Sequence, residues 1–295
     1  MRVTESTIAS NYLNNLNKTR ERIVQLQTQL ATGKRVNKSS DDPVAADTIL
    51  RLKGVIDKNE QYSRNADDGL SLIEQTEFGL DQFGEGLMKV KEMLVRINSD
   101  IDQDGLNAFA EEMDHILSDM VDVANTKFNG KYIFGGTNTM TPPFALAPDR
   151  SAVTANPAGI TGSIEYNVGE GVYQQVNIDG QEAFQGTTMF QQIIALRDGL
   201  RAGVLPTPAQ SDSLNQALQY VTGVGAKSGA LQTSMTAVGT RLDDQRIKMM
   251  ELLSMQQDTD IAESTLQMKH EEIMLEAALN TGARIIPKSL LDYLQ

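Results

Sequence analysis

The residues of this chain that could do chemistry are few and scattered. Its two histidines, His115 and His270, lie far apart in the sequence beside acidic neighbours, and cysteine is absent. A metal site needs several converging ligands, and a nucleophile needs an adjacent base. Adjacent acids such as Glu271 and Glu272 fall where exposed helix faces are expected. We therefore interpret them as solvated surface residues and not as an acid–base pair. The sequence therefore predicts no catalytic residue, no metal site and no cofactor.

One run of residues superficially resembles a phosphate-binding loop. Residues 223–228 read GVGAKS, but Val221 and Ala226 stand where that loop requires glycine. No strand is expected in front of it. We therefore expect this run to lie inside a helix and to bind no phosphate.

Composition excludes further classes of function. A net charge of −13 without a basic stripe argues against nucleic acid as a partner. No apolar stretch approaches the roughly 18 residues that a membrane-spanning helix needs, so membrane insertion is not expected. The first residues lack the apolar core and cleavage site of a secretory signal, so we expect export, if it occurs, to use another route. Trp is absent and aromatics make up 5%, which suits helices packed through Leu, Ile, Met and Ala.

The elements that position the side chains are mostly long helices. Apolar residues at steps of three and four predict helices near 5–31, 43–98, 104–128 and 189–201, and again from Pro208 to the C-terminal part. Asp42 is the expected N-cap of the second helix, with Pro43 at its first position. Its glycines, at 54, 69, 79, 84 and 86, are interpreted as points of close helix packing. The late heptad runs through Leu231, Met235, Val238, Leu242, Met249 and Leu252, with Gln245 in the seam, and predicts helix bundling.

A smaller part of the chain reads as β structure. Residues 131–134 (KYIF) predict a short strand of a hairpin. From 140 to 185 prolines and glycines punctuate short alternating runs, of which 163–168 and 173–178 predict strands. Asp179 and Gly180 are interpreted as a turn. These features indicate a small β-rich insert on a helical scaffold.

The two ends of the chain carry complementary stripes. The charged residues of 1–40 are mostly basic, and those of 258–295 are mostly acidic. A lone amphipathic helix is marginal in water, so each stripe needs a partner, and the C-terminal stripe, about 200° wide, needs more than one. We predict that the stripes pair with each other and also form the assembly surface. Their residues are Ile8, Leu16, Ile23, Leu26 and Leu30 at one end, and Ile261, Leu266, Met268, Ile273, Leu275 and Leu279 at the other.

The predicted fold class is mainly α. It comprises a long-helix coiled coil or bundle with paired N- and C-terminal helices, a short β-hairpin and a small β-rich inserted domain. The expected domains are the paired terminal helices (1–42 and 257–295), a helical core with the hairpin (43–139 and 189–256) and the β-rich insert (140–188).

Several motifs resemble the flagellin family. Residues 29–47 (QLATGKRVNKSSDDPVAAD) and 65–80 (NADDGLSLIEQTEFGL) are similar to its N-terminal region, and 229–232 (GALQ) with 258–263 (DTDIAE) to its C-terminal region. The opening MRVTESTIASNYLNNLN and the run 131–144 (KYIFGGTNTMTPPF) resemble the members that join hook and filament. The resemblance implies a non-enzymatic structural subunit of the bacterial flagellum. A short or minor filament flagellin remains an alternative, and a soluble coiled-coil secretion effector is a further one.

The resemblance also implies partners. A junction subunit would form a ring of copies, contacting hook-associated protein 1 below and flagellin above. It would be exported without a cleaved signal peptide by the flagellar type III apparatus, with a cytosolic chaperone on its C-terminal helix. Residues 86–97 are similar to the flagellin segment bound by an innate immune receptor, which makes Lys89, Glu92 and Leu94 candidate contacts. Lysines at 89 and 91 replace the arginines of flagellin, and this departure weakens the expected binding.

Overall fold

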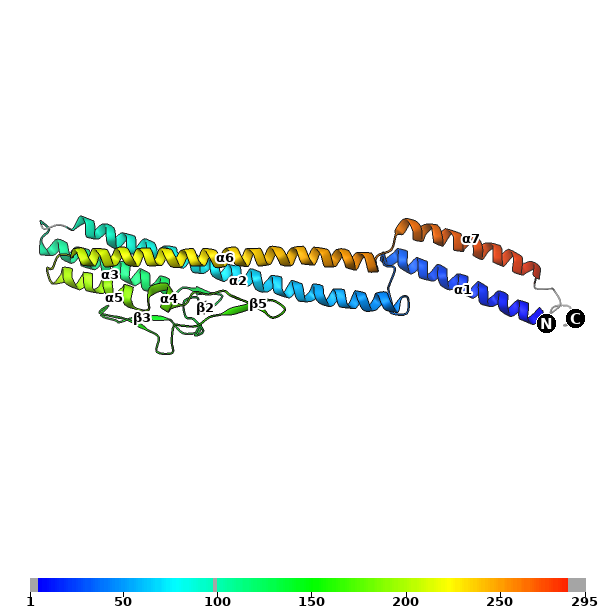
Figure 1. Cartoon of the computed structure of the whole chain (residues 1–295), viewed down its shortest axis with the longest axis horizontal. Coiled ribbons are helices and arrows are strands. Elements are labelled where there is room, and N and C mark those ends of the chain that lie inside the picture. Colours follow the sequence, from blue (N-terminus) through cyan, green and yellow to red (C-terminus); the bar gives the residue numbers. More distant parts are fainter. Residues whose placement is uncertain (1–4, 98–99, 286–295) are drawn as a thin grey trace. The chain divides into compact units, whose positions relative to one another are not determined.

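The protein is built mainly from long helices, as Figure 1 shows for the computed structural model, which describes residues 5–97 and 100–285. The helices are α1 (Glu5–Thr32), α2 (Pro43–Arg96), α3 (Gln103–Ala124), α4 (Gly180–Phe184), α5 (Thr188–Arg201), α6 (Pro208–Gln257) and α7 (Ile261–Ile285). Three antiparallel strand pairs accompany them: β1 (Lys127–Phe128) with β2 (Lys131–Tyr132), β3 (Phe144–Leu146) with β4 (Val153–Ala155), and β5 (Glu165–Gly169) with β6 (Val172–Gln175). The predicted fold class is confirmed.

The chain divides into two compact units. The first unit comprises residues 1–58 and 245–295, and the second comprises residues 59–244. Both boundaries therefore fall inside the continuous helices α2 and α6 rather than in loops. The three-part domain scheme, with its limits at 42, 140 and 188, stays a prediction.

Phenylalanine rings fill the core of the second unit. Five of them are at most 1% exposed: Phe83, Phe134, Phe144, Phe184 and Phe190. Phe184 of α4 lies at the centre, with its ring centroid 4.4 Å from that of Phe83 and 4.8 Å from that of Phe134. Tilted and edge-on ring pairs at such distances add to the free energy gained from burial. The short helix α4 thereby joins the β-rich segment to the long helices.

A buried ion-pair network fastens α5 to α3. The guanidinium of Arg197, 2% exposed, donates to Asp114 Oδ1 at 2.7 Å and to Asp198 Oδ1 at 2.7 Å. It also donates to the carbonyl oxygen of Arg150, in the turn between β3 and β4. Arg201 donates to the second oxygen of Asp114. Buried charges are tolerated only when they are paired and hydrogen-bonded, as here.

The glycines of α2 do not break the helix. A Cβ on Gly69 would lie 2.8 Å from Val176 Cγ1, and one on Gly86 would lie 2.7 Å from Met120 Cγ. One on Gly79 would lie 3.1 Å from the ring of Phe134. Close packing therefore accounts for these three glycines, as the sequence predicted. It does not account for Gly54, which has open space around it, or for Gly84, whose nearest neighbour would be 3.9 Å away.

Two predicted elements near the strands were wrong. The third helix ends at Ala124 instead of residue 128, because Lys127 and Phe128 pair with β2 across a turn in which Asn129 and Gly130 have positive φ angles. The expected turn at Asp179 and Gly180 is the start of α4, since Asp179 Oδ1 accepts a hydrogen bond from Glu182 N at 2.8 Å. An Asp-Gly pair serves equally as a turn or as a helix start, and local sequence does not distinguish the two.

The heptad expected in α6 holds only as far as Leu242. Beyond it Arg246, Met249 and Leu253 are half-buried, whereas Gln245 is exposed and Leu252 is 45% exposed. An extra step of four residues after Leu242 shifts the seam by one position, which is how a stutter locally unwinds a heptad repeat. GVGAKS lies inside α6, as expected.

Candidate functional site

Helices α1 and α7 of the first unit lie side by side and run antiparallel (Figure 1). Two polar contacts fix the pairing. Tyr12 Oη donates to the carbonyl oxygen of Ala278 at 2.8 Å, and Arg22 pairs with Glu271 at 3.3 Å. The contacts move towards the start of α7 as they move towards the end of α1, which is the order that an antiparallel pair requires. The structure thus brings together the two stripes that the sequence predicted to pair.

The stripe on α1 faces α7. Leu16 is 7% exposed, Ile23 and Leu26 are 9% exposed, and Leu30 is half-buried. Tyr12 and Thr19 are also half-buried, so the covered positions 12, 16, 19, 23, 26 and 30 alternate steps of four and three. This is the seam of a coiled coil. Ile8 belongs to α1, but its side chain lies outside the described residues.

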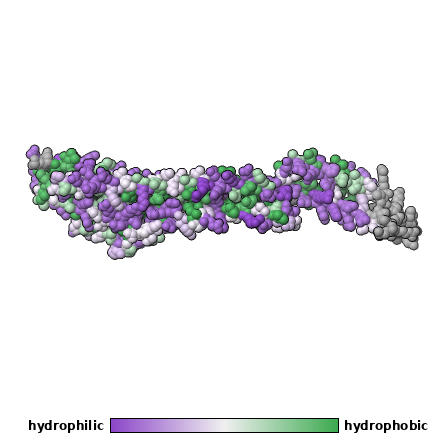
Figure 2. All heavy atoms as spheres, viewed as in Figure 1, coloured by the Kyte–Doolittle hydropathy of each residue, from purple (hydrophilic) through white to green (hydrophobic). Residues whose placement is uncertain are grey.

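The stripe on α7 is divided between two faces. Met268 and Leu275 are half-buried and face α1. Ile261, Leu266 and Ile273 are 63%, 72% and 64% exposed, and Leu279 is 46% exposed. Figure 2 shows apolar surface over α7. An apolar arc of this width leaves one face uncovered after α1 has docked.

The sequence-based prediction missed four of the six covered positions on α7. Its covered positions also alternate steps of four and three: Ser264, Met268, Glu271, Leu275, Ala278 and Gly282. Only Met268 and Leu275 of these are large and apolar, so a search for apolar spacing passes over the rest. Gly282 is buried against the Tyr12 ring, where a Cβ would collide with the phenol. The signal that could have found them is a heptad of small residues opposite a bulky stripe.

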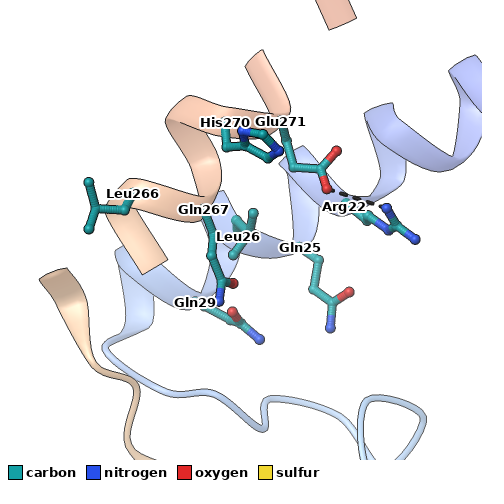
Figure 3. A pocket seen from close by; sticks show the side chains of 8 residues that line it. All are labelled: Arg22, Gln25, Leu26, Gln29, Leu266, Gln267, His270 and Glu271. Carbon is teal, nitrogen blue, oxygen red and sulfur yellow. Dashed lines mark hydrogen bonds and ion pairs between the residues drawn. The ribbon is translucent and has the colours of Figure 1, made fainter. Parts of the chain in front are cut away.

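A groove of about 550 Å³ lies between the two helices (Figure 3). Arg22, Gln25, Leu26 and Gln29 of α1 and Leu266, Gln267, His270 and Glu271 of α7 line it. Figure 3 shows Leu26 between the helices and Leu266 pointing away from α1. The lining is polar at the rim and has one ion pair, so it suits contact between helices better than catalysis.

Candidate chemistry is sparse in the part of the chain that the structure describes. His115 and His270 are both exposed, on different units. Among the described residues no group of three or more His, Asp or Glu side chains could hold a metal ion. On α7 the Lys269 ammonium donates to Glu272 at 2.8 Å, and this hydrogen bond raises the pKa of Lys269. That pair is exposed and stabilises the helix surface.

The candidate receptor contacts are not equivalent. Lys89 and Glu92 of α2 are exposed, but Leu94 is 9% exposed and belongs to the core of the second unit. The side chain of Leu94 therefore offers little surface to a partner. Receptor binding stays a prediction, and Lys89 and Glu92 are the residues able to contribute to it.

No helix in the described ranges, 5–97 and 100–285, is both long and apolar enough to cross a membrane.

Residues 3–139 match the family model of the bacterial flagellin N-terminal helical region. The chain is 25% identical to the flagellin of Bacillus subtilis (strain 168) over 308 residues, which cover all of both chains. It is 26% identical to a phase 1 flagellin of Salmonella naestved over 238 residues, or 78% of this chain, and spans 46% of that protein's length. Residues 3–139 are therefore similar to the helical N-terminal region of bacterial flagellins, as the motifs at 29–47 and 65–80 predicted.

Two solved structures share the fold. One is flagellar hook associated protein-3 from Legionella pneumophila, with a TM-score of 0.62 and 14% identity over 70% of this chain and 98% of that chain. The other is FlgL from Bacillus cereus, with a TM-score of 0.58 and 19% identity over 69% of this chain and 99% of that chain. At such identities the likeness concerns the fold.

Proposed function

We propose that this protein is a structural, non-enzymatic subunit of the bacterial flagellum that assembles through its paired terminal helices. The observation that carries the proposal is the exposed apolar face that α7 keeps after pairing with α1, marked by Ile261, Leu266 and Ile273. Covering such a face contributes about 1.5–3 kcal/mol per large side chain, which is enough to drive association when many copies meet.

Within the flagellum we propose the junction between hook and filament as its place. The fold shared with hook associated protein-3 and the flagellin N-terminal region support this assignment. The partners would be other copies in a ring, hook-associated protein 1 on one side and flagellin on the other. We further propose export through the flagellar type III apparatus without a cleaved signal peptide, with a chaperone on the C-terminal helix.

A short or minor filament flagellin is the second candidate. The observation that favours it is the match to Bacillus subtilis flagellin over the whole of both chains. The two candidates differ in where the protein lies. If the labelled protein is found only at the hook end of the filament, and cells without the protein cannot grow a filament, the junction assignment is supported. Labelled protein along the filament would support the flagellin.

Substitution on α7 tests the assembly surface. Ile273→Asp places a carboxylate on the exposed face, so we expect unchanged helix content in the free chain and loss of assembly, since burying an unpaired carboxylate costs several kcal/mol. Leu275→Asp, in the seam, should also weaken the pairing of α7 with α1. Normal filaments in cells carrying Ile273→Asp would contradict the proposal.

A further inference from the structure

The ends of four helices meet within the first unit, and two linkers pair there. Thr259 N donates to the carbonyl oxygen of Gly33 at 3.0 Å, and Arg35 N donates to that of Gln257 at 2.7 Å. Lys34 and Asp258 form an antiparallel bridge between these two bonds. The segment leaving α1 is thereby tied to the segment entering α7.

Arg35 connects three of these helix ends by itself. Its guanidinium donates to the carbonyl oxygen of Gln256 at 3.0 Å and to Asp42 Oδ2 at 3.2 Å. Its own carbonyl oxygen accepts from Gln29 Nε2 at 2.9 Å. Gln256 lies in the last turn of α6, where carbonyl groups lack partners within the helix and a positive charge is favourable. Asp42 caps α2 by accepting from Ala45 N at 3.0 Å.

The ion pair contributes little stability on its own. The side chains of Arg35 and Asp42 are 45% and 34% exposed, and exposed pairs are screened by water. What the arrangement supplies is geometry, because the planar guanidinium holds two partners at a fixed separation. A change at Arg35 should therefore alter positions more than it alters overall stability.

Position matters because the seam between α1 and α7 is periodic. Apolar contacts are non-directional, so a helix that slides by one turn, about 5 Å, meets a similar seam. The discrete contacts that oppose sliding are Tyr12 with Ala278, Arg22 with Glu271 and the paired linkers. The paired linkers follow the end of α1 and precede the start of α7. They therefore restrict how far either helix can move along the other.

We propose that Arg35 is the positioning residue that sets the register of α1 against α7. Its consequence for assembly rests on the proposed function, since the register decides which apolar side chains of α7 remain outside the pair. The register itself is a property of the single chain and can be measured without assembly.

The absence of cysteine allows a direct test in the full-length chain. Spin labels on Asn14→Cys and Asn280→Cys, both at exposed positions near the contact of Tyr12 with Ala278, report the register as a distance. We expect Arg35→Ala to broaden the distance distribution or shift it by about 5 Å, one helical turn. In this variant, hydrogen exchange of the backbone amides at position 35 and Thr259 should be about tenfold faster than in the parent chain, as for the loss of one hydrogen bond.

Two further variants make the test specific. Lys38→Ala removes an exposed positive charge from the same linker and should change neither measurement. Arg35→Lys keeps the charge but cannot span both partners, so it should restore part of the protection and narrow the distribution. Exchange of the Leu117 amide, which lies inside α3 of the second unit at a fully buried residue, should stay constant and would show that the chain remains folded.

An unchanged distance distribution and unchanged exchange in Arg35→Ala would overturn the proposal. That outcome is independent of the proposed function. Ile273→Asp reports on assembly and should leave the distance between the labels unchanged, so each idea can fail without the other.

Discussion

The two units of this protein differ in how completely they bury their apolar side chains. The second unit surrounds its aromatic cluster completely, so that Phe83, Phe134 and Phe184 are not exposed at all. The first unit covers one face of α7 with α1 and leaves Leu266 and Ile273 more than 60% exposed. A closed core stabilises the single chain, whereas an open apolar face gains its stabilisation only when another molecule covers it. Substitutions in the two units should therefore differ in kind.

The largest effect is expected at the centre of the closed core. Phe184→Ala removes a ring that contacts four other rings, and should lower the free energy of unfolding by about 3–5 kcal/mol. Urea denaturation followed by circular dichroism measures this. Phe78→Ala, at a position 56% exposed on α2, is the control and should stay within about 0.5 kcal/mol of the parent. Equal effects of the two substitutions would mean that the second unit is not closed.

A somewhat smaller effect is expected from the buried ion pairs. Burial lowers the pKa of Arg197, but hydrogen bonds to Asp114 and Asp198 outweigh it and raise that pKa, so the guanidinium stays charged. Asp114→Ala leaves Arg197 with only Asp198 and the Arg150 carbonyl oxygen, and should cost about 2–3 kcal/mol. Asp119→Ala removes an exposed carboxylate from the same helix and should be nearly neutral. The urea midpoints of the two variants measure the difference. If Asp114→Ala lowered the midpoint no more than Asp119→Ala, the result would contradict a stabilising role of the ion pairs.

Two glycine-to-alanine substitutions in α2 should change the stability in opposite directions, one in each unit. Gly86→Ala in the second unit forces a methyl group against Met120 and should destabilise by about 1–2 kcal/mol. Gly54→Ala in the first unit meets open space and should stabilise by about 0.5–1 kcal/mol, because alanine loses less conformational entropy in a helix. Thermal melting of both variants checks this. The same sign for both would contradict the packing described for α2.

The smallest effect concerns the helix cap of the first unit. A hydrogen bond from Ala45 N, together with the Arg35 guanidinium, lowers the pKa of Asp42 below its ordinary value of 3.8. A lowered pKa in the folded chain means that the carboxylate stabilises folding above 3.8 and loses this contribution as the pH falls through the folded-state value. Asp42→Asn keeps the cap but not the charge. Melting curves of parent and variant should differ slightly at pH 6 and converge near pH 2; a constant difference would contradict this.

Sequence reasoning worked where periodicity carries the information. The pairing of the terminal stripes, the long helices and the cap at Asp42 all followed from residue spacing and helix-start chemistry. It failed at residues 127–128 and at Asp179, where tertiary pairing chose between two conformations that the local sequence permits equally. The stutter after Leu242 was also missed, since an isolated stripe does not reveal which neighbour it meets.

The sequence by itself determined that the two ends form amphipathic helices and that each needs a partner, because apolar spacing and helix propensity are local properties. It also determined that the C-terminal stripe is wider than one neighbour can cover. Only the tertiary structure decided which half of that stripe α1 covers. Small residues such as Ser264, Ala278 and Gly282 define the seam through the closeness of approach they allow, and closeness is a property of two helices together.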